Sequence, residues 1–133
     1  MTMETIKHEG KILAIVVKTS EIKDKIFFVS PENFPMQVGV QNREKGVLVD
    51  AHEHLPFDKL ENVSVQEIFY IKSGKAQVGI YSNDKKIADR MISDGDLIIL
   101  DCGHSVRFLE DTSFIEIKQG PYRGRENEKR EIK

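Results

Sequence analysis

Residues 65–81 read VQEIFYIKSGKAQVGIY, and this stretch indicates the fold class. Two runs rich in β-branched and aromatic residues, 65–71 and 76–81, flank the short polar segment KSGK at residues 72–75. Such runs favour strands, and a short connection with a glycine between them is typical of a tight hairpin. We therefore predict two antiparallel strands joined by a hairpin turn.

Apolar residues recur on both sides of this stretch with a period nearer two than 3.6. Runs of this kind are separated by the turn formers Gly, Pro, Asn and Asp. They lie at residues 12–17, 26–29, 36–40, 47–54, 87–92, 97–100, 105–109 and 114–118. About eight to ten short strands without a convincing amphipathic helix predict an all-β sandwich or barrel. The interior of a small barrel can hold one ligand.

Length and charge indicate one domain and exclude two classes of partner. The chain has 133 residues, with 20 basic and 22 acidic side chains and a net charge of −2. A chain of this length buries most of one core without disulfides. Since the charges are balanced, we expect neither a nucleic-acid partner nor a membrane partner. We predict a β domain at residues 1–121 and a charged tail at residues 122–133.

The single cysteine and the N-terminal residues bear on the compartment. Cys102 cannot form an intrachain disulfide, and residues 1–4 lack the basic and apolar regions of a signal peptide. The longest apolar run, 12–17, is much shorter than the roughly 20 residues that a spanning helix needs. We therefore expect a cytoplasmic location. Cys102 itself is expected to be an inert residue at the end of a buried strand, and a thiolate nucleophile or soft ligand is the alternative.

Two histidines separated by one residue, His52 and His54, follow the apolar triplet at residues 47–49. Side chains in a strand alternate between faces, so both imidazoles would point to the same side and be available to one ion. The alternative is a pair of surface residues on an edge strand. Two imidazoles supply half of a typical metal site.

Two further residues are candidates for the other half. Glu67 alternates with Phe69 and Ile71 and so shares their strand face, which indicates that its carboxylate points toward an interior. His104 lies in the turn after the most apolar run, residues 97–100. Three imidazoles and one carboxylate would suit Fe(II), Mn(II), Ni(II) or Zn(II). As alternatives, Glu67 could be a solvated strand residue and His104 a turn residue bonded to backbone.

These residues fall into a pattern that resembles the two conserved motifs of the cupin superfamily. The pattern consists of Gly46, His52-Glu53-His54, Glu67 with Gly74 after six intervening residues, Gly95-Asp96 and Gly103-His104. The resemblance implies a double-stranded β-helix (jelly-roll) barrel that binds one metal. It also implies His52, His54, Glu67 and His104 as the ligands, and a homodimer. Residues 117–122, IKQGPY, resemble the end of small cupins encoded beside genes for cell-surface polysaccharide biosynthesis.

The chain departs from the family pattern in two places. The family glutamate usually comes three or four residues after the second histidine, where this chain has Asp58 and Lys59. We prefer Glu67 to Asp58 because only Glu67 is followed by an apolar strand and by glycine at the family spacing. In the second motif, the family has Pro-x-Gly-x-x-His where this chain reads DCGH at residues 101–104.

Three functions fit the sequence. The first is a metal-dependent isomerase, epimerase or dioxygenase that acts on a small polar molecule such as a sugar or a carboxylate metabolite. The second is a non-catalytic cupin that binds a small ligand. The third is a metal-free sugar isomerase or epimerase with His52 or His54 as general base. The sequence assigns no catalytic residue.

Overall fold

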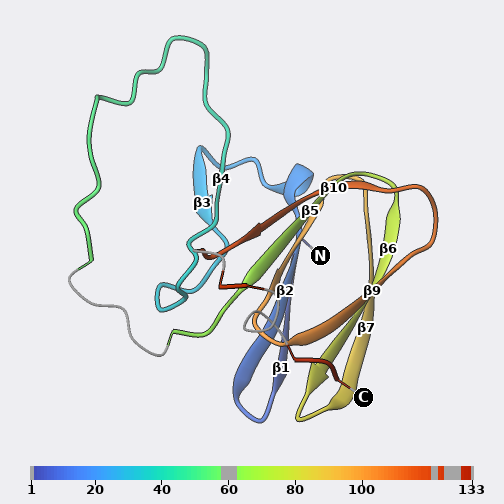
Figure 1. Ribbon diagram of the computed structural model, residues 1–133. Helices are drawn as coiled ribbons and strands as arrows, with labels where there is room; N and C mark the ends of the chain where they lie inside the picture. The colour runs from blue at the N-terminus through green and yellow to red at the C-terminus, as the bar shows by residue number, and fades with distance from the viewer. Residues whose placement is uncertain (1, 58–62, 121–122, 125–129, 133) are drawn as a thin grey trace.

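The computed structural model describes residues 2–57, 63–120, 123–124 and 130–132, and its regular structure is almost entirely β (Figure 1). The elements are β1 (Met3–His8), β2 (Lys11–Lys18), a 3-10 helix (Thr19–Glu21), β3 (Ile26–Phe28), β4 (Gly39–Gln41), β5 (Glu67–Ser73), β6 (Lys75–Ser82), β7 (Lys85–Ser93), β8 (Asp96–Leu100), β9 (Gly103–Phe108) and β10 (Ser113–Lys118). In the described part of the chain, no helix is long and apolar enough to cross a bilayer.

The strands form three antiparallel sheets. The largest sheet has the order β1-β2-β8-β5-β10, the second has the order β7-β6-β9, and β3 pairs with β4 in the third. The all-β domain is thus confirmed in its coarse form. Over the described residues, the sheets do not close into a barrel, because β10 ends one sheet and β9 ends another.

The predicted hairpin at residues 65–81 is wrong, although both of its strands exist. β5 pairs with β8 and β10, whereas β6 pairs with β7 and β9. Gly74, with φ at +114°, turns the chain from one sheet to the other. A side chain there would collide with the backbone of Asp111 and Thr112, so the segment KSGK forms a corner between two sheets and not a hairpin turn.

Strand β8 is buried on both faces, as its continuous apolar sequence predicts. Ile98 and Leu100 contribute to the core that fills the space between the two larger sheets. Leu97 and Ile99 point the other way, into a second core that also includes Val38. Each fully buried side chain of this size contributes roughly 1.5–3 kcal/mol to folding. The five-stranded sheet is therefore the layer that holds the strands of the site in place.

The strand predicted at residues 47–54 is absent. Residues 42–57 form an irregular segment without a partner strand among the described residues, and every one of them is exposed. Figure 1 shows this segment extending away from the sheets. Strand formation requires a neighbouring strand edge as well as an alternating sequence, and the segment has no such edge beside it in this structure.

Candidate functional site

A hollow of about 1140 Å³ lies between the two larger sheets. Strands β5 and β10 form one wall and β9 faces them from the other sheet, while residues 130–132 line the hollow from the C-terminal part of the chain. Glu67 and His104 both line it. The structure thus confirms the inward direction that alternation with Phe69 and Ile71 predicts for Glu67, because both apolar residues belong to the core between the sheets.

Strand pairing also directs His104 into the hollow. His104 lies opposite Ile80 in the pairing of β9 with β6, and the Ile80 side chain is fully buried between the sheets. Directly opposed residues in an antiparallel pair share a face, so the imidazole points inward as well. Its ring packs edge-on against Phe69, with the ring centroids 5.8 Å apart.

Glu67 and His104 form a close pair across the two sheets. The Nε2 atom of His104 lies 3.4 Å from Oε2 of Glu67, and the two side chains are 23% and 20% exposed. On its other side, the imidazole Nδ1 lies 3.0 Å from the carbonyl oxygen of Cys102. A carbonyl only accepts, so Nδ1–H must be the donor, and a proton at Nε2 then makes the ring an imidazolium.

The pKa values of the pair follow from this geometry. The hydrogen bond to Glu67 raises the pKa of His104, with burial acting in the opposite direction and the Cys102 carbonyl adding to the rise. The hydrogen bond from His104 lowers the pKa of Glu67, again against the effect of burial. Each partner therefore favours the charged form of the other.

Glu116 is a member of the site that sequence reasoning missed. It lines the hollow from β10, and its pKa is raised by burial, by the neighbouring charge of Glu67 and by a hydrogen bond that only its protonated form can donate to Glu67. Its position opposite Phe69 in the pairing of β10 with β5 places it diagonally from Glu67. The alternation of Glu116 with Phe114 was the available sequence signal for an inward carboxylate.

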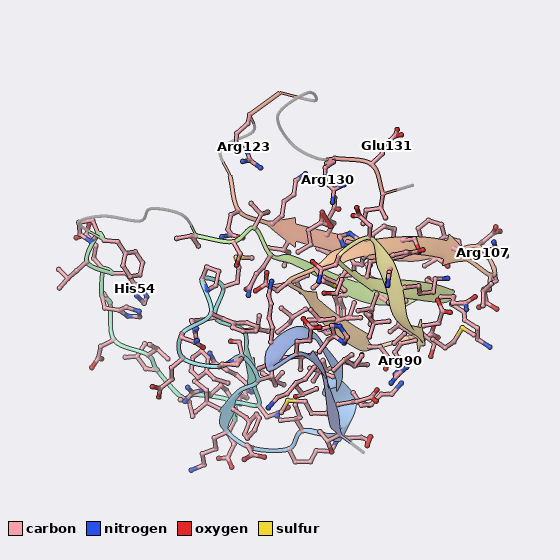
Figure 2. All side chains as sticks on the ribbon, turned by 90° about the horizontal axis from the view of Figure 1, so that it is seen from below. His54, Arg90, Arg107, Arg123, Arg130 and Glu131 are labelled. Carbon is pink, nitrogen blue, oxygen red and sulfur yellow. The ribbon has the colours of Figure 1, made fainter. Side chains whose placement is uncertain are left out.

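The histidine pair lies in the exposed segment and not in the hollow. The His52 and His54 rings are neighbours, with their centroids 5.2 Å apart, and His52 Nδ1 lies 2.8 Å from the Asp50 carbonyl oxygen. Figure 2 shows His54 on a segment that extends away from the sheets. Both residues are exposed to solvent.

The structure brings the four predicted ligands together only in pairs. His52 lies beside His54 and Glu67 beside His104, and no group of three or more His, Cys, Asp or Glu side chains in the described ranges is placed to hold a metal ion. Because the two pairs lie apart, the four residues do not fit a bound metal in this arrangement. Coordination by all four stays a prediction, and the alternative ligand Asp58 lies outside the described residues.

Cys102 borders the same hollow at the end of β8. Burial raises the pKa of its thiol to about 11, with the Asp101 charge adding to the rise. The thiol is therefore protonated at neutral pH, and a protonated thiol is a poor nucleophile and a poor metal ligand. This environment supports the inert interpretation of Cys102.

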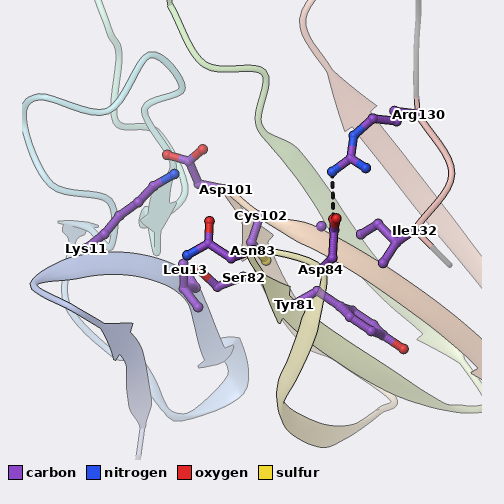
Figure 3. Close-up of a pocket in the computed structure, with 11 residues that line it drawn as sticks. Lys11, Leu13, Tyr81, Ser82, Asn83, Asp84, Asp101, Cys102, Arg130 and Ile132 are labelled. Atoms are coloured by element: carbon purple, nitrogen blue, oxygen red, sulfur yellow. Dashed lines mark hydrogen bonds and ion pairs between the residues drawn. The ribbon is translucent and has the colours of Figure 1, made fainter.

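A smaller pocket of about 220 Å³ adjoins the hollow (Figure 3). Arg130 closes one side through an ion pair with Asp84, whose oxygen lies 2.7 Å from the guanidinium. Ile132 packs closely against Gly103 and lines both the pocket and the hollow. Residues 130–132 of the charged tail thus form part of the wall of the site.

Comparison of the chain with protein-family models, with curated proteins and with solved structures gives no match. A function for the chain must therefore be argued from the fold and from the geometry of the hollow.

Proposed function

We propose that the hollow binds a small polar molecule and that His104 and Glu67 exchange protons with it, in isomerase or epimerase chemistry. The observation that carries this proposal is the paired imidazole and carboxylate, 3.4 Å apart, at a hollow of about 1140 Å³. This volume is slightly above the roughly 300–1,000 Å³ of typical small-molecule sites, so the hollow has room for such a ligand. This is the metal-free sugar isomerase or epimerase that the sequence allows as its third function. His104 takes the proton-transfer role that was expected of His52 or His54.

The two side chains have complementary roles. The bond to the Cys102 carbonyl fixes the ring and keeps a proton on Nδ1, so only Nε2 exchanges a proton with a ligand. Since Glu67 raises the pKa of His104, the imidazolium is available as a general acid near neutral pH. The ionised Glu67 is available as a general base. Proton removal by one group and return by the other is what isomerisation requires.

The cupin assignment is part of this proposal. Its support is that Glu67 and His104, two of the residues carried over from the family motifs, lie on facing strands of two antiparallel sheets. A non-catalytic cupin would use the same pair to hold a ligand, one group donating and the other accepting a hydrogen bond. Proton exchange with a ligand distinguishes the enzyme from this binding protein.

A metal-dependent enzyme is the second candidate, and the exposed segment favours it. The neighbouring His52 and His54 rings belong to the same segment as Leu48, Leu55 and Phe57, which are between 80% and 88% exposed. Apolar side chains exposed to this extent favour docking against another surface. Strands β9 and β10 are edge strands in the described part of the chain. Docking of the segment at these edges, in the same chain or in a homodimer, would bring the two ligand pairs together around Fe, Mn, Ni or Zn.

The test uses protein treated exhaustively with a chelator and incubated in deuterium oxide with a panel of aldoses and ketoses. Nuclear magnetic resonance then measures deuterium uptake at the carbon next to the carbonyl group. We expect the native chain to exchange and the His104→Gln variant to lose at least about 100-fold in rate, the usual scale of general acid–base catalysis.

The matched control is His8→Gln, because His8 is an N-terminal histidine that does not line the hollow. It should exchange at the native rate. Binding of a sugar without exchange would favour the non-catalytic alternative. Exchange that returns only after metal is added back, and that requires His54, would favour the metal-dependent enzyme.

A further inference from the structure

We propose that the part of the ligand that enters this hollow is neutral or cationic and carries hydroxyl or amino groups, and that Glu116 is the binding residue that excludes anions. This inference rests on the proposed function and narrows its substrate class. It selects the sugar-like ligand over the carboxylate metabolite that the sequence leaves equally open.

The distribution of charge around the hollow is the first argument. Among the residues that the structure describes, three carboxylates line it, from Glu67, Glu116 and Glu131. The lining cation Arg130 is held by Asp84, and His104 is held by Glu67. Figure 2 shows Arg130 and Glu131 on the same side of the sheets.

One further cation lies near the carboxylates. Lys118 is opposite Glu67 in the pairing of β10 with β5, and its charge acts on both Glu67 and Glu116. With Lys118, three cations face four carboxylates, counting Asp84, so among the described residues named here one negative charge remains when all four carboxylates are ionised. A partly enclosed site with an excess of carboxylates repels phosphate and carboxylate groups more strongly than open solvent does.

Hydrogen-bonding capacity is the second argument. An ionised carboxylate only accepts hydrogen bonds, and a protonated Glu116 gives its one proton to Glu67. In either state a ligand group that meets Glu116 must be a donor. Hydroxyl, amino and ammonium groups are donors, whereas an ionised carboxylate or phosphate oxygen is an acceptor. The position of Glu116 diagonally from Glu67 gives a ligand two acceptors on one wall, with the imidazole facing them from β9.

The aromatic lining is the third argument. Phe69 contacts both His104 and Phe114 edge-on, with centroid distances of 5.8 and 5.5 Å. Phe114 lines the hollow beside Glu116 on the same strand face. Apolar ring surfaces beside carboxylate acceptors fit a molecule that has C–H faces and peripheral hydroxyl or amino groups. A sugar ring has this distribution of groups.

The experiment compares three probes that share one ring: glucose, glucosamine and glucuronate. Saturation-transfer nuclear magnetic resonance and titration with the native full-length chain give a Kd for each. We expect glucosamine and glucose to bind and glucuronate to give no measurable binding. Glu116→Gln should weaken glucosamine about tenfold, the usual loss for one charge-assisted hydrogen bond, and affect glucose less. Glu116→Lys should admit glucuronate.

Glu110→Gln is the control, because Glu110 is an exposed carboxylate in the turn that follows β9 and does not line the hollow. It should leave all three Kd values unchanged. Glucuronate could instead bind the native chain as tightly as glucosamine and lose this binding in His104→Gln. That result would overturn the exclusion of anions and leave the proposed function standing. Unchanged glucosamine binding in Glu116→Gln would overturn the role of Glu116. Absence of binding by all three probes would overturn both proposals.

Discussion

Two regions of this chain carry equal shares of the predicted metal site and differ in almost every structural respect. In the region of β5 to β10, inward side chains such as Ile80 and Ile98 are fully buried. In the segment at residues 42–57, every residue is exposed, including Leu48 and Leu55. An alternating sequence therefore directs a side chain inward only where a second strand fixes its register.

The largest effect expected from this difference concerns the free energy of unfolding. Ile98→Ala removes buried methyl groups from the central strand β8 and should cost about 2–5 kcal/mol in urea denaturation. Leu48→Ala, at a side chain that is 80% exposed, should stay within about 0.5 kcal/mol. A loss of 2 kcal/mol or more in Leu48→Ala would mean that the segment packs against another surface.

The two regions should also differ in the reactivity of a thiol placed in each. Because burial raises the pKa of Cys102 to about 11, its thiolate is about 100-fold less abundant at neutral pH than that of an ordinary cysteine. Iodoacetamide should therefore label native Cys102 at least about 100-fold more slowly than the denatured chain. A Cys102→Ser chain with Val49→Cys in the exposed segment should be labelled at the ordinary rate. Equal labelling rates at position 49 and at native Cys102 would contradict the burial of the Cys102 thiol.

A smaller effect is expected from the His104 and Glu67 pair as pH changes. The raised pKa of His104 stabilises the fold fully below its unfolded pKa of about 6.5, and this contribution is lost as pH rises through the folded pKa. The lowered pKa of Glu67 stabilises the fold above about pH 4.5, and this contribution is lost as pH falls through its folded pKa. The pair therefore stabilises most between about pH 4.5 and 6.5.

His104→Gln measures this contribution. The difference in unfolding free energy between native and variant chains should reach about 1 kcal/mol near pH 5.5 and shrink above pH 7, as expected for a partly exposed pair. Glu116 and Lys118 also act on Glu67, and Glu116→Gln is the control for the share that Glu116 has in the pH dependence. A difference in unfolding free energy between the native and His104→Gln chains that grows above pH 7 would contradict the pairing of His104 with Glu67.

Sequence reasoning predicted what depends on local alternation and missed what depends on distant partners. The inward direction of Glu67 and the double burial of residues 97–100 follow from the order of apolar residues alone. The corner at Gly74 does not, because it depends on the backbone of Asp111 passing close to it. Glu116 was predictable from alternation, yet its meeting with Glu67 depends on the register of β10 against β5.

The same reasoning explains the histidine pair. An H-x-H sequence places two rings together in any extended backbone, and His52 and His54 are neighbours even without a strand. Their distance from Glu67 and His104 is a property of the whole fold, set by whether the segment finds a strand edge.

The smallest expected effect is the response of stability to metal, and it decides between the two candidate functions. While the segment stays away from the hollow, saturating Zn²⁺ or Mn²⁺ should leave the thermal midpoint unchanged, because two separate ligand pairs bind an ion weakly. Four converging ligands would instead stabilise the fold by about 2.7 kcal/mol at 100 times the dissociation constant. A shift of that size, lost in both His54→Gln and Glu67→Gln but kept in His8→Gln, would show that the segment docks at the hollow. A shift that depends on His54 and survives Glu67→Gln would locate the ion on the exposed histidine pair alone.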